Sequence, residues 1–194
     1  MKDTFASVEE KIVFHTIQCI EQYGMSGATN RRIAQMAGVN IAAINYYFRS
    51  KDVLIQRCME ITLKNAFDLS DFPPMRGASA PDFCIAILMN LFEGGFRYPN
   101  LSRAHFYKLL AEGQYDPLLV EHISRFIDEL ATGLHDRGCA LEMDELKLAL
   151  IQIVLAVMLA ILAPALFEQH HGINLRDPDT CLAYVTRLVS RLLT

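Results

Sequence analysis

The chain has 194 residues, of which 52% are hydrophobic and 21% charged, and its formal net charge is −4 at pH 7. This length allows one or two compact domains, and the acidic balance excludes a protein that is basic over its whole surface. Residues 1–57 nevertheless contain seven basic and five acidic residues, a charge of +2, whereas the rest of the chain carries −6. Such a distribution is compatible with a local positive face near the N-terminus that could meet nucleic acid.

The cysteines and the first residues indicate a reduced, cytoplasmic protein. The five cysteines are widely spaced, without the pattern of a zinc site: Cys19, Cys58, Cys84, Cys139 and Cys181. Charged residues such as Lys2, Asp3 and Glu9 stand where a signal peptide would need an apolar core. The histidines are scattered as well, so the sequence predicts no metal and no cofactor.

Apolar residues recur at spacings of three and four along the whole chain, which predicts an all-α protein of about nine helices. The first helix begins near Val8 and ends at Gly24, since glycine accepts the left-handed conformation that closes a helix. A second helix follows Thr29 and runs to Ala37. A third starts at Asn40, a good N-cap, and ends near Phe48, after which Ser50 caps a long fourth helix.

The second and third helices are joined by Ala37-Gly38-Val39, a turn that lets the third helix cross the second steeply, as in a helix-turn-helix. The exposed residues of the third helix would then be Asn40, Ala42, Ala43, Asn45, Tyr46 and Tyr47. Asparagine can read adenine edges and alanine can touch a thymine methyl group. Nearby cations would meet phosphates without reading sequence: Arg31, Arg32, Arg49 and Lys51.

A loop rich in proline follows the fourth helix between Leu69 and Pro81, and further helices are expected at about 81–98, 100–113, 117–137, 142–170 and 178–194. We therefore predict an N-terminal three-helix DNA-binding domain, residues 1–57. The remainder, residues 58–194, is expected to form a helical bundle for ligand binding and dimerisation.

The segment from Ala28 to Leu54 resembles the TetR family of regulators. The residues that carry the resemblance are Thr29, Ile33-Ala34, Ala37-Gly38-Val39, Tyr47-Phe48-x-Ser50-Lys51 and Leu54. The resemblance covers about 50 residues and includes nothing specific beyond residue 70. The length and helical content of the remainder suit the ligand-binding and dimerisation domain of that family.

The resemblance implies roles for individual residues. Thr29, Tyr47 and Lys51 match positions that usually hold phosphates, whereas Asn40, Ala42, Ala43 and Tyr46 match positions that usually contact bases. The chain departs from many members at Ala42-Ala43, where they have glycine or proline followed by threonine. It departs again at Asn45, where they have tyrosine. This departure puts a phosphate contact at residue 45 in doubt and makes a contact with a base possible there.

The family also implies a small-molecule pocket, and the middle helices favour an apolar one. Its candidate lining residues are Phe92, His105, Phe106, Tyr107, Tyr115, His122 and Phe126. The sequence contains no catalytic triad, phosphate-binding loop or pair of carboxylates at a catalytic spacing, and we therefore predict that the protein is not an enzyme.

The last two helices carry more apolar surface than one bundle face needs, which predicts a four-helix interface between two copies. The residues assigned to it are Leu148, Ile151, Leu155, Met158, Leu159, Leu162, Leu182, Val185, Leu188, Val189 and Leu192. Residues 148–167 are also long and apolar enough to span a bilayer. A small membrane-associated helical protein is therefore the alternative, although an acidic flank and the lack of an aromatic belt favour a helix buried in a dimer.

These features predict a transcription regulator, by default a repressor, although activation is also open. Two recognition helices of a homodimer would occupy successive major grooves of a palindromic operator, about 34 Å apart. A small apolar effector would shift the fourth helix and so change that separation. The expected partners are duplex DNA, a second copy of the chain and this effector, with no membrane.

Overall fold

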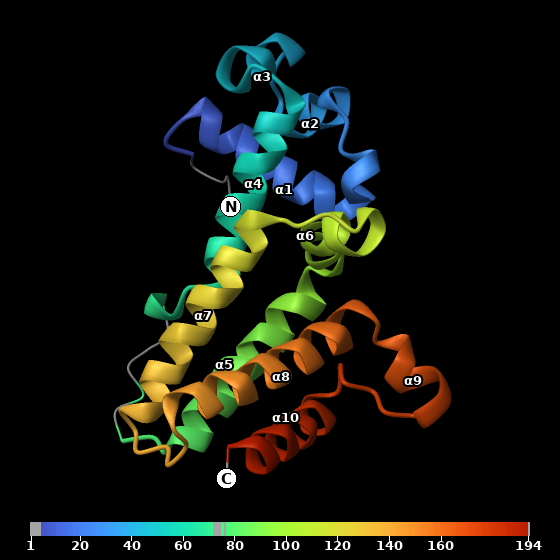
Figure 1. Ribbon diagram of the computed structural model, residues 1–194. Helices are drawn as coiled ribbons and strands as arrows, with labels where there is room; N and C mark the ends of the chain where they lie inside the picture. The colour runs from blue at the N-terminus through green and yellow to red at the C-terminus, as the bar shows by residue number, and fades with distance from the viewer. Residues whose placement is uncertain (1–4, 72–74, 76, 194) are drawn as a thin grey trace. The chain divides into compact units, whose positions relative to one another are not determined.

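The computed structural model describes residues 5–71, 75 and 77–193, and this part of the chain is all helical, as predicted (Figure 1). It contains ten α-helices and one short 3-10 helix. Their bounds are α1 Val8–Gly27, α2 Asn30–Ala37, α3 Ile41–Phe48, α4 Lys51–Phe67, η1 Leu69–Asp71, α5 Ala80–Arg97, α6 Pro99–Glu112, α7 Pro117–His135, α8 Met143–Leu162, α9 Ala165–His171 and α10 Pro178–Leu192.

Two helix boundaries differ from the prediction. The single helix expected over 142–170 is broken at Pro164, because proline lacks the N–H that would continue the helical hydrogen bonds. α1 continues to Gly27, but Gly24 leaves the helical conformation with φ 71° and ψ 174°. The glycine therefore kinks the chain where the sequence predicted an end, and one further turn follows before α2.

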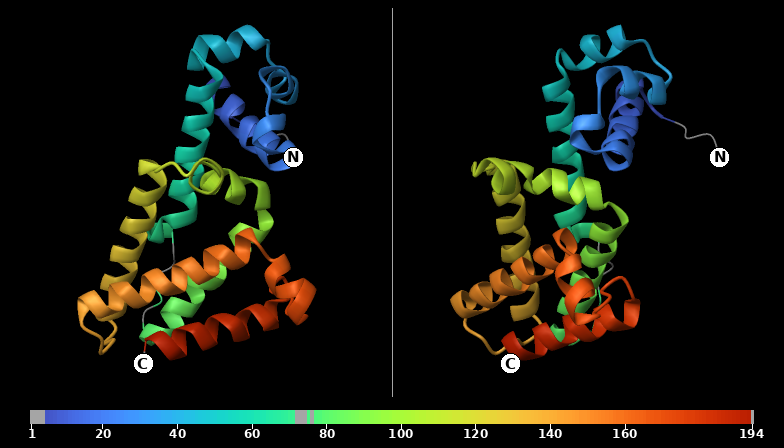
Figure 2. Two further views of the ribbon diagram at one scale, coloured as in Figure 1. Left: turned by 45° about the vertical axis from the view of Figure 1, so that its right-hand side comes forward. Right: turned by 90° about the vertical axis from the view of Figure 1, so that its right-hand side faces the viewer.

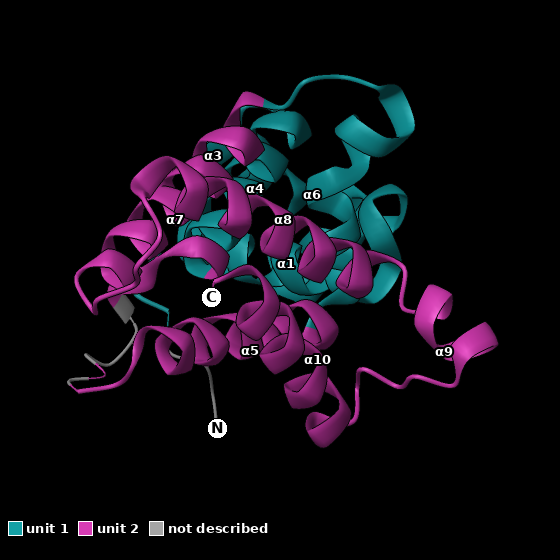
Figure 3. Ribbon diagram, turned by 60° about the horizontal axis from the view of Figure 1, so that its bottom comes forward, with its two compact units in different colours: residues 1–65, 98–116 teal, residues 66–97, 117–194 magenta. Residues whose placement is uncertain are grey.

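The described residues form two compact units (Figure 3). The first contains the residues up to Asn65 together with Tyr98–Asp116, and the second contains Ala66–Arg97 and the residues from Pro117 onward. Helix α6 therefore packs with α1–α4, although the prediction placed it in the C-terminal domain. The functional division at residue 57 stays a prediction, whereas the compact units divide the chain later, in the last turns of α4.

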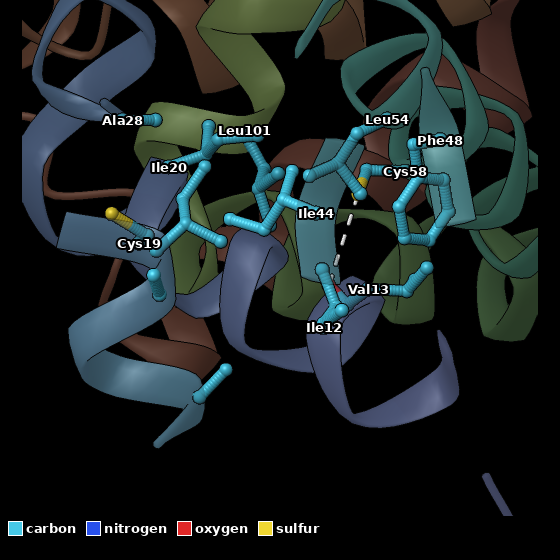
Figure 4. Close-up of a cluster of buried hydrophobic side chains, with 13 residues drawn as sticks. Ile12, Val13, Cys19, Ile20, Ala28, Ile44, Phe48, Leu54, Cys58 and Leu101 are labelled. Carbon is cyan, nitrogen blue, oxygen red and sulfur yellow. Dashed lines mark hydrogen bonds between the residues drawn. The ribbon is translucent and has the colours of Figure 1, made fainter. Parts of the chain in front are cut away.

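The first unit is built around one apolar cluster to which each of α1–α4 contributes (Figure 4). Ile12 and Ile20 come from α1, Ile33 from α2, Ile44 from α3 and Leu54 from α4, and all five are fully buried. The Cys58 thiol lies in the same cluster and donates to the Val13 carbonyl at 3.7 Å. Apolar burial on this scale fixes α3 against its neighbours, so that only one of its faces remains exposed.

Helix α6 is attached to α1 by the carboxylate of Glu21. One carboxylate oxygen accepts hydrogen bonds from the backbone N–H groups of Asn100, at 3.1 Å, and Leu101, at 3.0 Å. The Asn100 side chain returns a bond of 2.7 Å to the Glu21 carbonyl. Tyr98, the N-cap residue of α6, provides no side-chain cap. Glu21 thus satisfies the first amides of α6 from a distant part of the sequence.

The second unit consists of α5, α7, α8, α9 and α10, and α5 lies against both α8 and α10 (Figure 2). Gly95 of α5 allows a close approach to α8, because a Cβ atom there would lie 2.6 Å from a methyl carbon of Ile161. Gly133 of α7 similarly faces the ring of Phe83, at 2.9 Å from such a Cβ. Small residues at these contacts let the helices of the second unit pack closely.

Candidate nucleic-acid interface

The turn between α2 and α3 has the geometry that the sequence predicted. Gly38 takes the left-handed conformation, with φ 61° and ψ 39°, and its N–H bonds to the carbonyls of Ala34 and Gln35. The next amide, that of Val39, bonds to Ala34 at 3.0 Å. A residue with a Cβ atom is strained at such a φ, so glycine is favoured where α2 ends and α3 begins within three residues.

Side-chain caps fix the first residues of these helices. Thr29 Oγ1 accepts a bond from the backbone N–H of Arg32 at 3.3 Å, and Asn40 Oδ1 accepts one from Ala42 at 2.9 Å. Ser50 Oγ in turn accepts from Val53 at the start of α4, at 3.2 Å. Each cap satisfies an amide that the helix leaves unbonded. Thr29 and Asn40, both predicted to contact DNA, are exposed and also have this structural role.

Helix α3 has one buried and one exposed face. Ile44 and Phe48 are buried, whereas Ala42, Asn45 and Tyr46 are exposed. Tyr46 has 80% of its surface exposed and its ring meets that of Tyr47 edge-on, with centroids 5.1 Å apart. Ala43 and Tyr47 lie at the flanks of the exposed face, half-buried and 41% exposed respectively. The structure therefore exposes Ala42, Asn45 and Tyr46 together, whereas Ala43 packs in part against the core.

Three cations lie along the elements that flank this surface. Arg31 is exposed on α2, Arg49 is exposed at the C-cap of α3 and Lys51 is half-buried at the start of α4. In the described part of the chain, none of the three side chains has an ion-pair partner. Their charge is thus available to an anion such as a phosphate.

Arg32, predicted to contact phosphate, also has internal contacts. Its guanidinium donates to the Gly27 carbonyl at 2.5 Å and lies over the Tyr23 ring, 4.3 Å from the centroid. These contacts hold the turn between α1 and α2, and the phosphate contact of Arg32 stays a prediction. The sequence did not distinguish Arg31 from Arg32, because the internal contacts of Arg32 are made with residues several positions away.

Two features of this surface were missed by the sequence reasoning. Lys11 of α1 reaches the turn, with Nζ 3.7 Å from where a Cβ on Gly38 would lie, so a fourth cation adjoins the turn. Arg49 has a φ of 63°, which makes it the only described non-glycine residue with a positive φ. Its ψ of −41° lies outside the left-handed helical region that usually closes a helix, so the rule for helix ends does not predict this conformation.

The seven residues predicted to line a ligand pocket are divided between the two units. His105, Phe106, Tyr107 and Tyr115 belong to the first, and Phe92, His122 and Phe126 to the second. His105 Nε2 lies 3.0 Å from Thr62 Oγ1, a contact that joins α6 to α4. Phe92 and Phe126 are buried, whereas Tyr115 is 70% exposed. The ligand assignment stays a prediction.

The residues predicted for the dimer interface separate into exposed and buried sets. Exposed residues lie at helical spacing on α8 and are here called the α8 stripe: Leu148, Ile151, Leu155 and Leu159. Leu182 of α10 is exposed too, and Leu162, Leu188 and Leu192 are half-buried. Met158, Val185 and Val189 are buried within the chain, so they support these helices from behind and do not belong to an exposed surface.

Four of the five cysteines are buried and pack as small apolar residues, whereas Cys139 is half-buried. Burial raises the pKa of Cys58 to about 12 and that of Cys181 to about 11. For Cys84, burial first and the neighbouring Cys139 second raise the pKa to about 12. Thiolate formation is suppressed at these positions, which makes these thiols poor nucleophiles and poor metal ligands. Among the described residues, no group of three or more histidine, cysteine or acidic side chains is arranged to hold a metal ion.

Helix α8 is the one described helix whose length and composition would let it cross a membrane. Half of its apolar window is buried inside the protein. A core helix of a globular protein passes the same test, and the buried half of α8 packs against α5, α7 and α10. The apolar run at 148–167 is therefore accounted for in part by the core of the second unit.

Comparison with known proteins connects this geometry to a family. The model of bacterial regulatory proteins of the tetR family matches residues 12–58. YttP of Bacillus subtilis, a probable HTH-type transcriptional regulator, is 40% identical over 50 residues, which are 26% of this chain and 24% of that protein. The matched segments span only 24 to 41% of the length of the curated relatives. These relatives are named as transcriptional regulators, in agreement with the prediction that the chain is not an enzyme.

Solved structures extend the likeness beyond the N-terminal domain. A TetR-like transcriptional regulator from Rhodococcus sp. RHA1 is similar with a TM-score of 0.65 and 16% identity, over 97% of this chain and 96% of that chain. The regulator FadR from Bacillus subtilis, solved in complex with stearoyl-CoA, is similar with a TM-score of 0.66 and 15% identity, over 95% and 97% of the two chains. The helix-turn-helix domain of this chain thus belongs to the TetR family of bacterial regulatory proteins, and the chain has the fold of TetR-like regulators along nearly its whole length.

Proposed function

We propose that this protein is a cytoplasmic, DNA-binding transcriptional regulator that reads its operator with α3. The observation that carries the proposal is the exposed face of Ala42, Asn45 and Tyr46, which lies between elements bearing the cations Arg31, Arg49 and Lys51. Hydrogen-bonding and methyl groups suit the base edges of a major groove, and flanking cations suit the phosphates beside it.

The protein acts as a homodimer in this proposal, with the α8 stripe at the interface. Leu155 is 62% exposed and Leu148 58%, and an exposed apolar row of this length is unusual on a monomer. Pairing two copies would cover these side chains, and an ordinary interface of about 800 Å² per partner would suffice. A twofold dimer would place two recognition helices on the two halves of a palindromic operator.

A small apolar effector releases the DNA in this proposal, which makes the protein a repressor. Support comes from FadR, a regulator of the same fold that was solved with stearoyl-CoA, a ligand with a long acyl chain. The effector would act by shifting α4, whose first residue, Lys51, lies beside α3. Coupling is reciprocal, so DNA must weaken effector binding by the same factor.

A membrane-associated role is the alternative raised by α8, and the observations do not favour it. Half of the apolar window of α8 is buried in the protein, and the second copy proposed here would cover the exposed half. The fold, moreover, is one shared with regulators. A chain that remains in solution without detergent and elutes as a dimer would exclude the membrane role.

The experiment that tests the function is a selection of random duplexes by the purified full-length chain at low ionic strength, followed by anisotropy titrations. Enrichment of a palindrome with half-sites about one helical turn apart is expected. Raising the salt concentration should weaken binding with a slope that reports the number of phosphates contacted. If no duplex is bound in low salt, the proposal is wrong.

A further inference from the structure

The recognition helix carries no charged side chain. Residues Ile41–Phe48 of α3 comprise only isoleucine, alanine, asparagine, tyrosine and phenylalanine. In the major groove, arginine and lysine form the strong contacts with guanine, and aspartate and glutamate accept from the cytosine amino group. α3 therefore lacks the side chains that would select G·C pairs directly beneath it.

Asn40, at the start of this surface, is only partly available to a base. Its Oδ1 accepts the hydrogen bond from Ala42 that caps α3, at 2.9 Å. A bidentate contact with adenine needs the amide oxygen and the amide nitrogen together. Asn40 can donate through Nδ2 to an acceptor on a base or a phosphate, but a bidentate contact with adenine would have to share an oxygen that already accepts the cap bond.

The side-chain amide of Asn45, unlike that of Asn40, does not cap a helix. It is exposed, and in the described part of the chain its side chain has no hydrogen-bonding partner. Its backbone carbonyl, by contrast, is already bonded to the Arg49 amide at 2.9 Å, which fixes the last turn of the helix. The methyl group of Ala42 is exposed one helical turn before Asn45 and is small enough to let a base edge approach closely, whereas Ala43 packs against the core.

We infer that the operator half-site beneath α3 is centred on A·T pairs, with Asn45 bound to an adenine edge and the methyl group of Ala42 against a thymine methyl. This inference rests on the proposed function. The cations that could read guanine lie outside residues 41–48: Arg31 is on α2, Arg49 is at the C-cap of α3 and Lys51 is on α4. Any preference for G·C pairs therefore falls at the borders of the half-site. At the centre of the half-site, the contacting side chains are uncharged.

The test uses the full-length chain and the duplex obtained by selection, with uracil replacing thymine at one central position at a time. Uracil lacks only the methyl group, so loss of one buried methyl contact should weaken binding about fourfold. The variant Ala42→Gly should bind thymine and uracil duplexes equally at the position that Ala42 contacts. Circular dichroism of each variant checks that α3 is retained.

Asn45→Ala tests the adenine contact. Binding to the selected duplex should fall about 5- to 100-fold, and replacement of one central A·T pair by G·C should no longer matter to the variant. Asn40→Ser is the matched control, because serine keeps the cap but removes the amide, and it should leave the preference at the centre unchanged.

Three results would overturn the inference. These are a selected half-site with G·C pairs at its centre, equal binding of thymine and uracil duplexes by the unmodified chain, and an unchanged central preference in Asn45→Ala. In each of these cases the protein still binds DNA, and the proposed function stands. Failure to bind any duplex at low ionic strength would instead remove the proposed function and the inference together.

Discussion

Helices α3 and α8 each have a buried and an exposed face, but the two exposed faces differ in chemistry. α3 exposes amide, hydroxyl and methyl groups on a helix of 8 residues, next to cations on its neighbours. α8 exposes only large aliphatic side chains and Gln152 over the middle of a helix of 20 residues. Groups of the first kind suit the polar edges of a nucleic acid, whereas those of the second suit another apolar surface.

The difference between α3 and α8 also lies in what holds each surface in place. α3 is too short to be stable alone and depends on its caps and on Ile44 and Phe48 in the core. α8 is long and buries the face opposite its exposed stripe against three other helices. The exposed surface of α3 should therefore be sensitive to changes in the core beneath it. Substitutions in the α8 stripe, by contrast, should leave the fold of the single chain intact and affect only dimerisation.

The largest effect is expected from Leu155→Asp in the α8 stripe. Two unpaired carboxylates would have to enter the apolar interface of a symmetric dimer, which should weaken dimerisation by more than about 100-fold. The fold of each chain should be unaffected, because Leu155 is 62% exposed. Sedimentation equilibrium measures the association. Val120→Asp, at an exposed apolar site of α7, is the control; a dimer that persists in Leu155→Asp would place the interface elsewhere.

The substitutions Ile44→Ala and Tyr46→Ala distinguish the role of the buried face of α3 in stability from the role of its exposed face in DNA binding. Ile44 is fully buried, so its truncation should lower the free energy of unfolding by about 2–5 kcal/mol. Tyr46 is 80% exposed, and its truncation should change stability by less than about 0.5 kcal/mol while weakening DNA binding by about 1–3 kcal/mol. Urea unfolding and anisotropy titrations measure the two quantities. Equal loss of stability in both variants would contradict the assignment of faces.

Substitutions of the adjacent Arg31 and Arg32 on α2 should have smaller effects. One should change only DNA binding, and the other should lower stability. Arg32→Gln removes the contacts to Gly27 and Tyr23 and should cost about 1–3 kcal/mol of stability, measured by urea unfolding. Arg31→Gln should leave stability unchanged and reduce the salt dependence of DNA binding by about one phosphate contact. If Arg32→Gln is as stable as the unmodified chain, the internal role given to Arg32 is incorrect.

The smallest effect concerns a helix terminus far in sequence from both surfaces. Side-chain and then backbone hydrogen bonds from Thr180 hold the pKa of Asp177, the N-cap of α10, below its ordinary value. A lowered carboxyl pKa stabilises the fold above the ordinary titration range of the carboxyl group, and this contribution is lost as the pH falls through the lowered pKa. Melting temperatures across that acidic range should therefore fall slightly more for the unmodified chain than for Asp177→Asn, which caps without ionising.

Local features could be predicted from the sequence by itself. The all-α fold, the glycine turn at Gly38, the caps at Asn40 and Ser50 and the family resemblance all depend on residues within a few positions of one another. Turn and cap geometry is set by nearby backbone atoms, so short-range rules suffice. The exposed face of α3 followed from the same periodicity, since Ile44 and Phe48 could pack in only one direction.

Only the tertiary structure decided which residues have distant partners. It assigned Arg32 to an internal contact, placed α6 with α1 through Glu21, 79 positions from Asn100, and divided the apolar residues of α8 into a buried set and an exposed stripe. A helix that is apolar on every side contains no periodic signal for which side faces the core. Such choices depend on the packing of the whole chain, because burial is shared among helices that are far apart in sequence.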